Sequence, residues 1–163
     1  MDIIEVAQEL MRFKTETGNK ETIDQAMNYI KNTMSLIGAK VDIFEAKDTA
    51  PVIFIRNKKT LDFDALVLGH IDVVPAEDKM FTPIIKDGNL YGRGSLDMKS
   101  FAAVALNSMQ HVINNKLPIS FGIILSSDEE TGSKGTKAFL KKHDKIIMNK
   151  PSCVTATTRP DPT

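Results

Sequence analysis

The sequence predicts an α/β layer fold with a mixed, mostly parallel sheet. Two observations support this prediction: helical and apolar strand patterns alternate along the chain, and two of the strand patterns are apolar at nearly every position. Apolar runs of that kind are typical of strands that are covered on both faces. The length of 163 residues suits one ordinary domain and is too short for two.

Four helices are expected because apolar residues recur at spacings of three and four. Ile3, Ala7 and Leu10 form one such face in the first helix. Gly38 is a stop signal for the second helix, and Pro118 ends the third. The expected helices cover residues 2–14, 21–37, 97–114 and 134–142.

The strands fall into two kinds. Val41 and Ile43 alternate with polar residues, which predicts a half-buried strand, whereas the runs before Gly69 and Ser126 predict strands buried on both faces. Residues 84–91 predict a separate hairpin that turns at Asp87-Gly88. The expected strands of the main sheet cover residues 40–44, 52–55, 65–68, 121–125 and 153–156.

Charge and composition exclude several classes of protein. Lys+Arg and Asp+Glu both number 21, so the usual electrostatic reason for a nucleic-acid or anionic-membrane partner is absent. No apolar run reaches the roughly 18–20 residues of a membrane span. Cys153 is the single cysteine, and Asp2 and Glu5 stand where a secretory signal would be positive. We therefore expect a cytoplasmic protein without nucleic-acid or membrane partners.

Polar residues with metal-binding chemistry follow the two apolar strands. GHIDVVP places His70 and Asp72 after the first strand, and SSDEETGSKGT places Asp128, Glu129 and Glu130 after the second. Ligands of α/β sheets gather at the carboxyl ends of parallel strands. We therefore expect these side chains to lie in one site.

Each motif also has a simpler interpretation. His70 is either a metal ligand whose tautomer is fixed by Asp72 or a strand-end histidine in a local hydrogen bond. The three acids are either a solvated turn or a pair of functional glutamates, of which one binds a metal and the other activates water. Asp161, in RPDPT, is either a ligand or part of a turn.

Asp97 lies in YGRGSLDMKS, immediately before a predicted helix. Its carboxylate either caps that helix or bridges two cations, since it offers two oxygens. The glycines here do not have the spacing of a dinucleotide or phosphate loop, which argues against nucleotide binding. As a set, one histidine and several carboxylates suit zinc, cobalt or manganese in a hydrolytic site with two metals roughly 3.5–4 Å apart.

GHIDVVP, DGNLYGRGSLDMKS and SSDEETGSKGT, in this order, resemble the motifs of the co-catalytic zinc aminoacylase and exopeptidase family. Its members include succinyl-diaminopimelate desuccinylase, acetylornithine deacetylase, aminoacylase and glutamate carboxypeptidase. The resemblance extends from the first helix to about residue 140. It implies a three-layer α/β/α catalytic domain that hydrolyses amide bonds of N-acyl amino acids or small peptides with a metal-activated water.

The resemblance also implies a role for each residue. Glu129 is the general base, Asp72 orients His70, and Asp97 bridges both metals and is followed by a cis peptide to Met98. The implied cofactors are two zinc ions, with cobalt or manganese as alternatives. The implied metal ligands are His70, Asp97, Glu130 and Asp161.

Members of that family are longer and carry a lid or dimerisation domain and a later histidine in the second metal site. His111 and His143 are expected at a surface or a helix end and do not replace that histidine. The resemblance therefore implies that residues 1–163 are a truncated, N-terminal portion of the catalytic domain, and it leaves a homodimer open. Such a chain is expected to bind one metal well at most and to be catalytically weak or inactive, whereas the parent protein is expected to be a metallohydrolase. A competing hypothesis is a non-catalytic metal-binding fragment or interaction remnant.

Overall fold

The computed structural model describes residues 1–146 and 153–155. All four expected helices are confirmed, and α4 has the predicted bounds. The helices are α1 (Ile3–Arg12), α2 (Lys20–Leu36), α3 (Lys99–Asn114) and α4 (Lys134–Lys142), with short 3-10 turns η1 (Asp78–Phe81), η2 (Glu129–Thr131) and η3 (Asp144–Ile146). The strands are β1 (Lys40–Phe44), β2 (Val52–Arg56), β3 (Ala65–His70), β4 (Ile84–Lys86), β5 (Asn89–Tyr91), β6 (Phe121–Ser126) and β7 (Cys153–Thr155).

Local signals set the helix ends. The Asp2 side chain accepts the N–H groups of Ile4 and Glu5 at 2.8 and 3.0 Å, which caps α1. Gly38 follows α2 with φ of 88°, a left-handed conformation that lets the chain turn back into β1.

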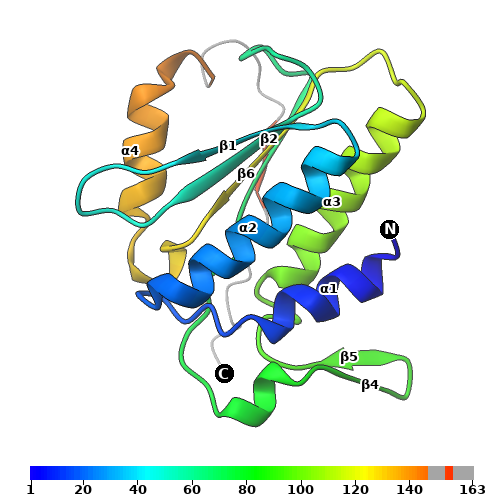
Figure 1. The fold of residues 1–163 in the computed structure, drawn as a ribbon, viewed down its shortest axis with the longest axis vertical. Coiled ribbons are helices and arrows are strands. Elements are labelled where there is room, and N and C mark those ends of the chain that lie inside the picture. The colour runs from blue at the N-terminus through cyan, green and yellow to red at the C-terminus, as the bar shows by residue number, and fades with distance from the viewer. Residues whose placement is uncertain (147–152, 156–163) are drawn as a thin grey trace.

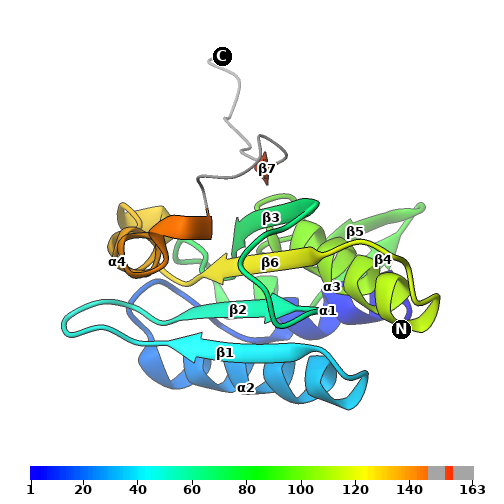
Figure 2. The same cartoon turned by 90° about the horizontal axis from the view of Figure 1, so that it is seen from above.

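The main sheet has the strand order β1-β2-β6-β3-β7 (Figure 2). The predicted mixed sheet is confirmed, but two of the four described pairings are antiparallel, so parallel pairs do not predominate among the described strands. The short connection from β1 to β2 explains part of this difference, because neighbours joined by so few residues must be antiparallel. β3 and β6 are parallel, with His70 opposite Ser126, so their carboxyl ends meet at one edge.

Helices cover both faces of the sheet and form the three predicted layers (Figure 1). Successive residues of a strand face opposite sides. Ile53 and Ile55 of β2 therefore pack into the core shared with α1, α2 and α3, while Val52 and Phe54 pack against Phe139 of α4. This double burial explains why the β2 and β6 sequences are apolar at consecutive positions.

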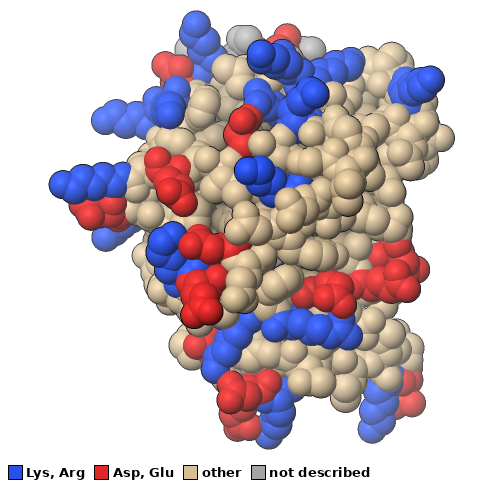
Figure 3. Space-filling model, viewed as in Figure 1, with Lys and Arg blue, Asp and Glu red and all other residues tan. Residues whose placement is uncertain are grey.

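The β4–β5 hairpin stands apart from the main sheet, below the helices in Figure 1. It turns at Asp87-Gly88, as the sequence predicts. On the face shown in Figure 3, positive and negative side chains are interspersed. Among the described residues, no helix combines the length and apolar character needed to cross a bilayer.

Candidate metal centre

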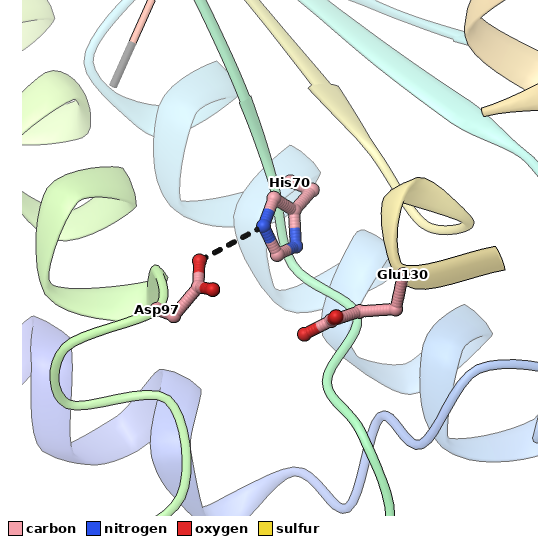
Figure 4. Close-up of side chains that lie close together, drawn as sticks. All are labelled: His70, Asp97 and Glu130. Carbon is pink, nitrogen blue, oxygen red and sulfur yellow. Dashed lines mark hydrogen bonds and ion pairs between the residues drawn. The ribbon is translucent and has the colours of Figure 1, made fainter. Parts of the chain in front are cut away.

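His70, Asp97 and Glu130 converge at the edge where β3 and β6 end (Figure 4). One ligand atom from each residue lies within 4.8 Å of the others. His70 Nε2 is 3.2 Å from Asp97 Oδ1 and 3.7 Å from Glu129 Oε2. The structure thus brings together four residues that the sequence singles out, contributed by β3, the turn before α3 and η2.

The His70 ring is buried, with only 3% of the residue exposed. Nδ1 lies 3.0 Å from the carbonyl oxygen of Asp72 and 3.3 Å from its carboxylate. The local hydrogen bond of the simpler interpretation is therefore present. It places a proton on Nδ1 and leaves Nε2 facing Asp97 and Glu129.

Two opposing effects act on the pKa of His70. Burial lowers it, but the hydrogen bonds and charge of Asp72, together with the charge of Glu129, outweigh burial and raise the pKa to about 9. Without a cation, the imidazole is therefore protonated near neutral pH. A metal ion that binds Nε2 must displace this proton.

Asp97 does not cap α3, so the capping interpretation is wrong. Met98 is the N-cap residue of α3, and no side-chain capping bond is formed there. The Asp97 carboxylate instead faces the His70 ring (Figure 4). The Asp97–Met98 peptide is cis, as the family resemblance implies.

Asp72 is fully buried and contacts more than His70. Its carboxylate accepts the backbone N–H groups of Glu129 at 3.1 Å and Glu130 at 3.2 Å, and the hydroxyl of Thr17 at 2.8 Å. Burial raises the pKa of Asp72, but the hydrogen bonds from His70 and Thr17 and the charge of His70 lower it below its ordinary value. One ionised carboxylate therefore joins the histidine to the turn that carries the two glutamates.

The three consecutive acids have different surroundings. Asp128 is buried, and its Oδ2 accepts the N–H of Gly135 in the first turn of α4 at 2.7 Å, so the solvated-turn interpretation is wrong for this residue. The Glu129 side chain is half exposed. Burial raises the pKa of Glu130; the charge of His70 opposes this effect, and three neighbouring carboxylates reinforce it. Such crowding of carboxylates favours a bound cation.

Three residues that were considered in the sequence analysis are not part of this cluster as described. Asp161 falls outside the described residues. His111 is exposed in the last turn of α3. His143 is the C-cap residue of α4, and its ring centroid lies 4.6 Å from that of Phe139. Both histidines are thus at helix ends, as expected.

Two residues beside the site, Thr17 and Lys99, were not predicted from the sequence. Lys99 is 1% exposed, and its Nζ donates to the carbonyl oxygen of Phe13 at 2.6 Å. Burial lowers its pKa to about 7, with Asp72 opposing and Arg93 reinforcing the shift. Its position could have been predicted, because Lys99 shares the spacing of the buried α3 face. No comparable pattern marks Thr17.

The donor set fits a divalent metal. An imidazole nitrogen and two carboxylates suit zinc, cobalt or manganese, and the buried Asp72 behind His70 is the usual partner of a metal-binding histidine. Asp97 can reach two ions, since its side chain is 40% exposed and has two oxygens.

Comparisons with known proteins show which family the chain resembles. The model of Peptidase family M20/M25/M40 matches residues 66–161, more than half of the chain. Succinyl-diaminopimelate desuccinylase of Helicobacter pylori (strain HPAG1) is 34% identical over 163 residues, which cover 87% of this chain and 40% of the relative. The same enzyme of Wolbachia sp. subsp. Brugia malayi (strain TRS) is 32% identical over 165 residues, covering 90% of this chain and 39% of the relative. The chain thus spans about 40% of the length of these curated relatives.

Solved structures show the same fold. Human carnosine dipeptidase 1 superposes with a TM-score of 0.81 at 20% identity, covering 96% of this chain and 38% of that chain. The M20 family metallo-carboxypeptidase Sso-CP2 from Sulfolobus solfataricus gives a TM-score of 0.80 at 23% identity, covering 95% and 37%. Together with the family match over residues 66–161, these findings show that the chain belongs to Peptidase family M20/M25/M40.

Proposed function

We propose that this protein is a metal-dependent hydrolase of amide bonds in N-acylated amino acids or small peptides. The observation that carries the proposal is the convergence of His70, Asp97 and Glu130 beside Glu129 at the ends of two parallel strands. The desuccinylase relatives favour an acylated amino acid as substrate. Because the chain spans about 40% of their length, this proposal rests on the site rather than on similarity along the whole relative.

We assign the following roles within this proposal. His70 would hold one zinc ion, Glu130 would hold a second, and Asp97 would contribute to both sites. Asp72 orients His70 through the contacts to Nδ1. Asp161, which lies outside the described residues, would supply a further ligand to the first ion, as the family resemblance implies. Cobalt and manganese are alternative occupants, because all three metals accept this mixture of nitrogen and oxygen donors.

Glu129 is the proposed general base. The metals, when bound, would polarise the substrate carbonyl and lower the pKa of a bound water. Glu129 suits the base role because its half-exposed carboxylate reaches the donor cluster without belonging to it, at 3.7 Å from His70 Nε2. It would accept a proton from the attacking water and return it to the leaving amine. Its backbone N–H is fixed by Asp72, which limits movement of the base.

A single substitution tests the proposal. Glu129→Gln keeps the size of the side chain and removes its basicity, so hydrolysis of N-succinyl and N-acetyl amino acids should fall about 10²- to 10⁴-fold while zinc content stays unchanged. Asp62→Asn is the matched control, because exposed Asp62 precedes β3 and lies at the opposite end of the sheet from the site.

Three outcomes would count against the proposed enzyme or against the role of Glu129. Zinc binding with no hydrolysis by the unsubstituted chain would support the competing hypothesis of a non-catalytic metal-binding fragment. Equal hydrolysis by Glu129→Gln and the unsubstituted chain would assign the base role to another group. Failure to bind zinc, cobalt or manganese would remove the metal centre itself.

A further inference from the structure

The segment between α1 and α2 lies against the residues that follow β3. Glu16 and Val73 form a parallel bridge, supported by backbone hydrogen bonds from Val73 N–H to Thr15 at 3.0 Å and from Thr17 N–H to Val73 at 3.2 Å. The Thr15 hydroxyl also donates to the carbonyl oxygen of Ile71. Residues 15–17 are therefore held beside Asp72 by contacts that do not involve the metal-binding side chains.

This attachment brings the Thr17 hydroxyl to the carboxylate of Asp72. The hydroxyl donates to Oδ2 at 2.8 Å, on the same oxygen that accepts the N–H of Glu130 at 3.2 Å. The other oxygen accepts the N–H of Glu129 and lies 3.3 Å from His70 Nδ1. Among the described residues, Thr17 is the hydrogen-bond donor to this carboxylate that lies outside the segments bearing the proposed ligands and base.

We infer that Thr17 is a positioning residue of the metal site: its hydroxyl fixes the Asp72 carboxylate, which in turn holds the His70 ring and the Glu129–Glu130 turn. The inference rests on the proposed function and adds a residue to it. A carboxylate with four neighbours can satisfy them only in one rotamer, and the donor from the separate 15–17 segment selects that rotamer. Residues behind a metal ligand typically change metal affinity 10- to 100-fold when they are removed.

The test compares variants that differ by one hydroxyl. Thr17→Val removes the hydroxyl at nearly constant size, Thr17→Ser keeps it, and Thr15→Val removes a hydroxyl of the same segment that bonds a backbone carbonyl instead of Asp72. The readouts are the cobalt dissociation constant with the visible cobalt spectrum, and amide hydrogen exchange at Glu129 and Glu130 in the metal-free chain.

We expect Thr17→Val to weaken cobalt binding about 10-fold, to shift the cobalt spectrum and to speed exchange of the Glu130 amide. Thr17→Ser should restore all three, and Thr15→Val should lower stability while leaving cobalt affinity unchanged. If Thr17→Val does not fold, Thr17→Ala against Thr17→Ser makes the same comparison.

Equal cobalt affinity and equal amide exchange in Thr17→Val and the unsubstituted chain would overturn the inference. An equal loss of affinity in Thr15→Val would also overturn it, since the effect would then be general loosening of the segment. If the unsubstituted chain binds no cobalt, the proposed function fails, and amide exchange alone decides whether Thr17 positions the turn.

Discussion

Replacing Gly135 with alanine tests how tightly the glutamate-bearing turn is held. Gly135 lies in the first turn of α4, where its N–H donates to Asp128 at 2.7 Å. A Cβ at this position would lie 2.3 Å from the carbonyl oxygen of Ala50 and 3.4 Å from Asp128 Oδ2. The close contact is with backbone, so no side-chain rotation can relieve it.

Two effects of opposite sign determine the outcome. Alanine is favoured over glycine within a helix by about 1 kcal/mol. Carbon and oxygen atoms approach to about 3.3 Å, so the two segments must separate by roughly 1 Å. Overpacking lowers stability by about 1–3 kcal/mol. Because the partner of the new Cβ is rigid backbone, we expect the destabilisation from overpacking in Gly135→Ala to be near the upper value, about 3 kcal/mol. We therefore expect a net loss of about 2 kcal/mol in the free energy of unfolding.

Urea unfolding at pH 7 measures this change, and cobalt affinity shows whether Glu129 and Glu130 move with the turn. Lys141→Ala is the control, because this exposed position in the same helix should change stability by less than about 0.5 kcal/mol. A Gly135→Ala variant that is more stable than the unsubstituted chain by about 1 kcal/mol would refute the steric argument, since helix propensity would then have prevailed.

Two further predictions concern Asp72 and His143. Asp72→Leu should lower the free energy of unfolding by about 3–5 kcal/mol, because it removes the buried acceptor shared by His70 and two backbone N–H groups. Asp72→Asn keeps an acceptor and should therefore lower the free energy of unfolding less. Equal losses in the two variants would contradict this account. For His143, burial and the charges of Lys142 and Arg56 lower the pKa below 6.5, with Asp42 opposing. At a pH between the lowered folded-state pKa and 6.5, the unfolded chain binds more protons than the folded chain. The stabilisation that neutral His143 allows is therefore present above pH 6.5 and is lost as the pH falls through the folded-state pKa. Denaturant unfolding from pH 5 to 8 should therefore show a smaller acid loss for His143→Gln than for the unsubstituted chain, and parallel curves would contradict the shift.

Elements whose pattern has one physical cause could be predicted from the sequence. β1 alternates because one face meets the core, and its predicted bounds agree with the structure. The apolar runs at β3 and β6 predict strands that are buried on both faces; β6 is buried throughout, whereas residues 65–68 of β3 are only partly buried. The parallel pairing of the two strands places His70 and the acids at one edge, as expected. The proportion of parallel strand pairs was less predictable from the sequence, because it depends on which strands become neighbours in the sheet.

Asp97 shows where sequence patterns are ambiguous. A carboxylate just before a helix is equally typical of a cap and of a ligand, and only the position of the α3 start at Lys99 separates the two. The contacts of Asp72 were beyond prediction for another reason. Thr17 and Glu130 are 55 and 58 residues away from it in the chain, and no periodicity links them.

The arrangement of charge explains why one site suits both a proton and a metal ion. Asp72, Asp97, Glu129 and Glu130 lie around a single imidazole, and the buried carboxylate of Asp72 is separately stabilised by hydrogen bonds from Thr17 and from the Glu129 and Glu130 amides. In the metal-free protein, positive charge at the cluster is supplied by protonated His70, whose pKa is raised to about 9. A divalent cation at the position that Nε2 faces would supply more positive charge than the single proton does. A bound ion would therefore compete with the proton for Nε2, whereas the contacts of Asp72 to Nδ1 and to the Glu129 and Glu130 amides do not involve that nitrogen.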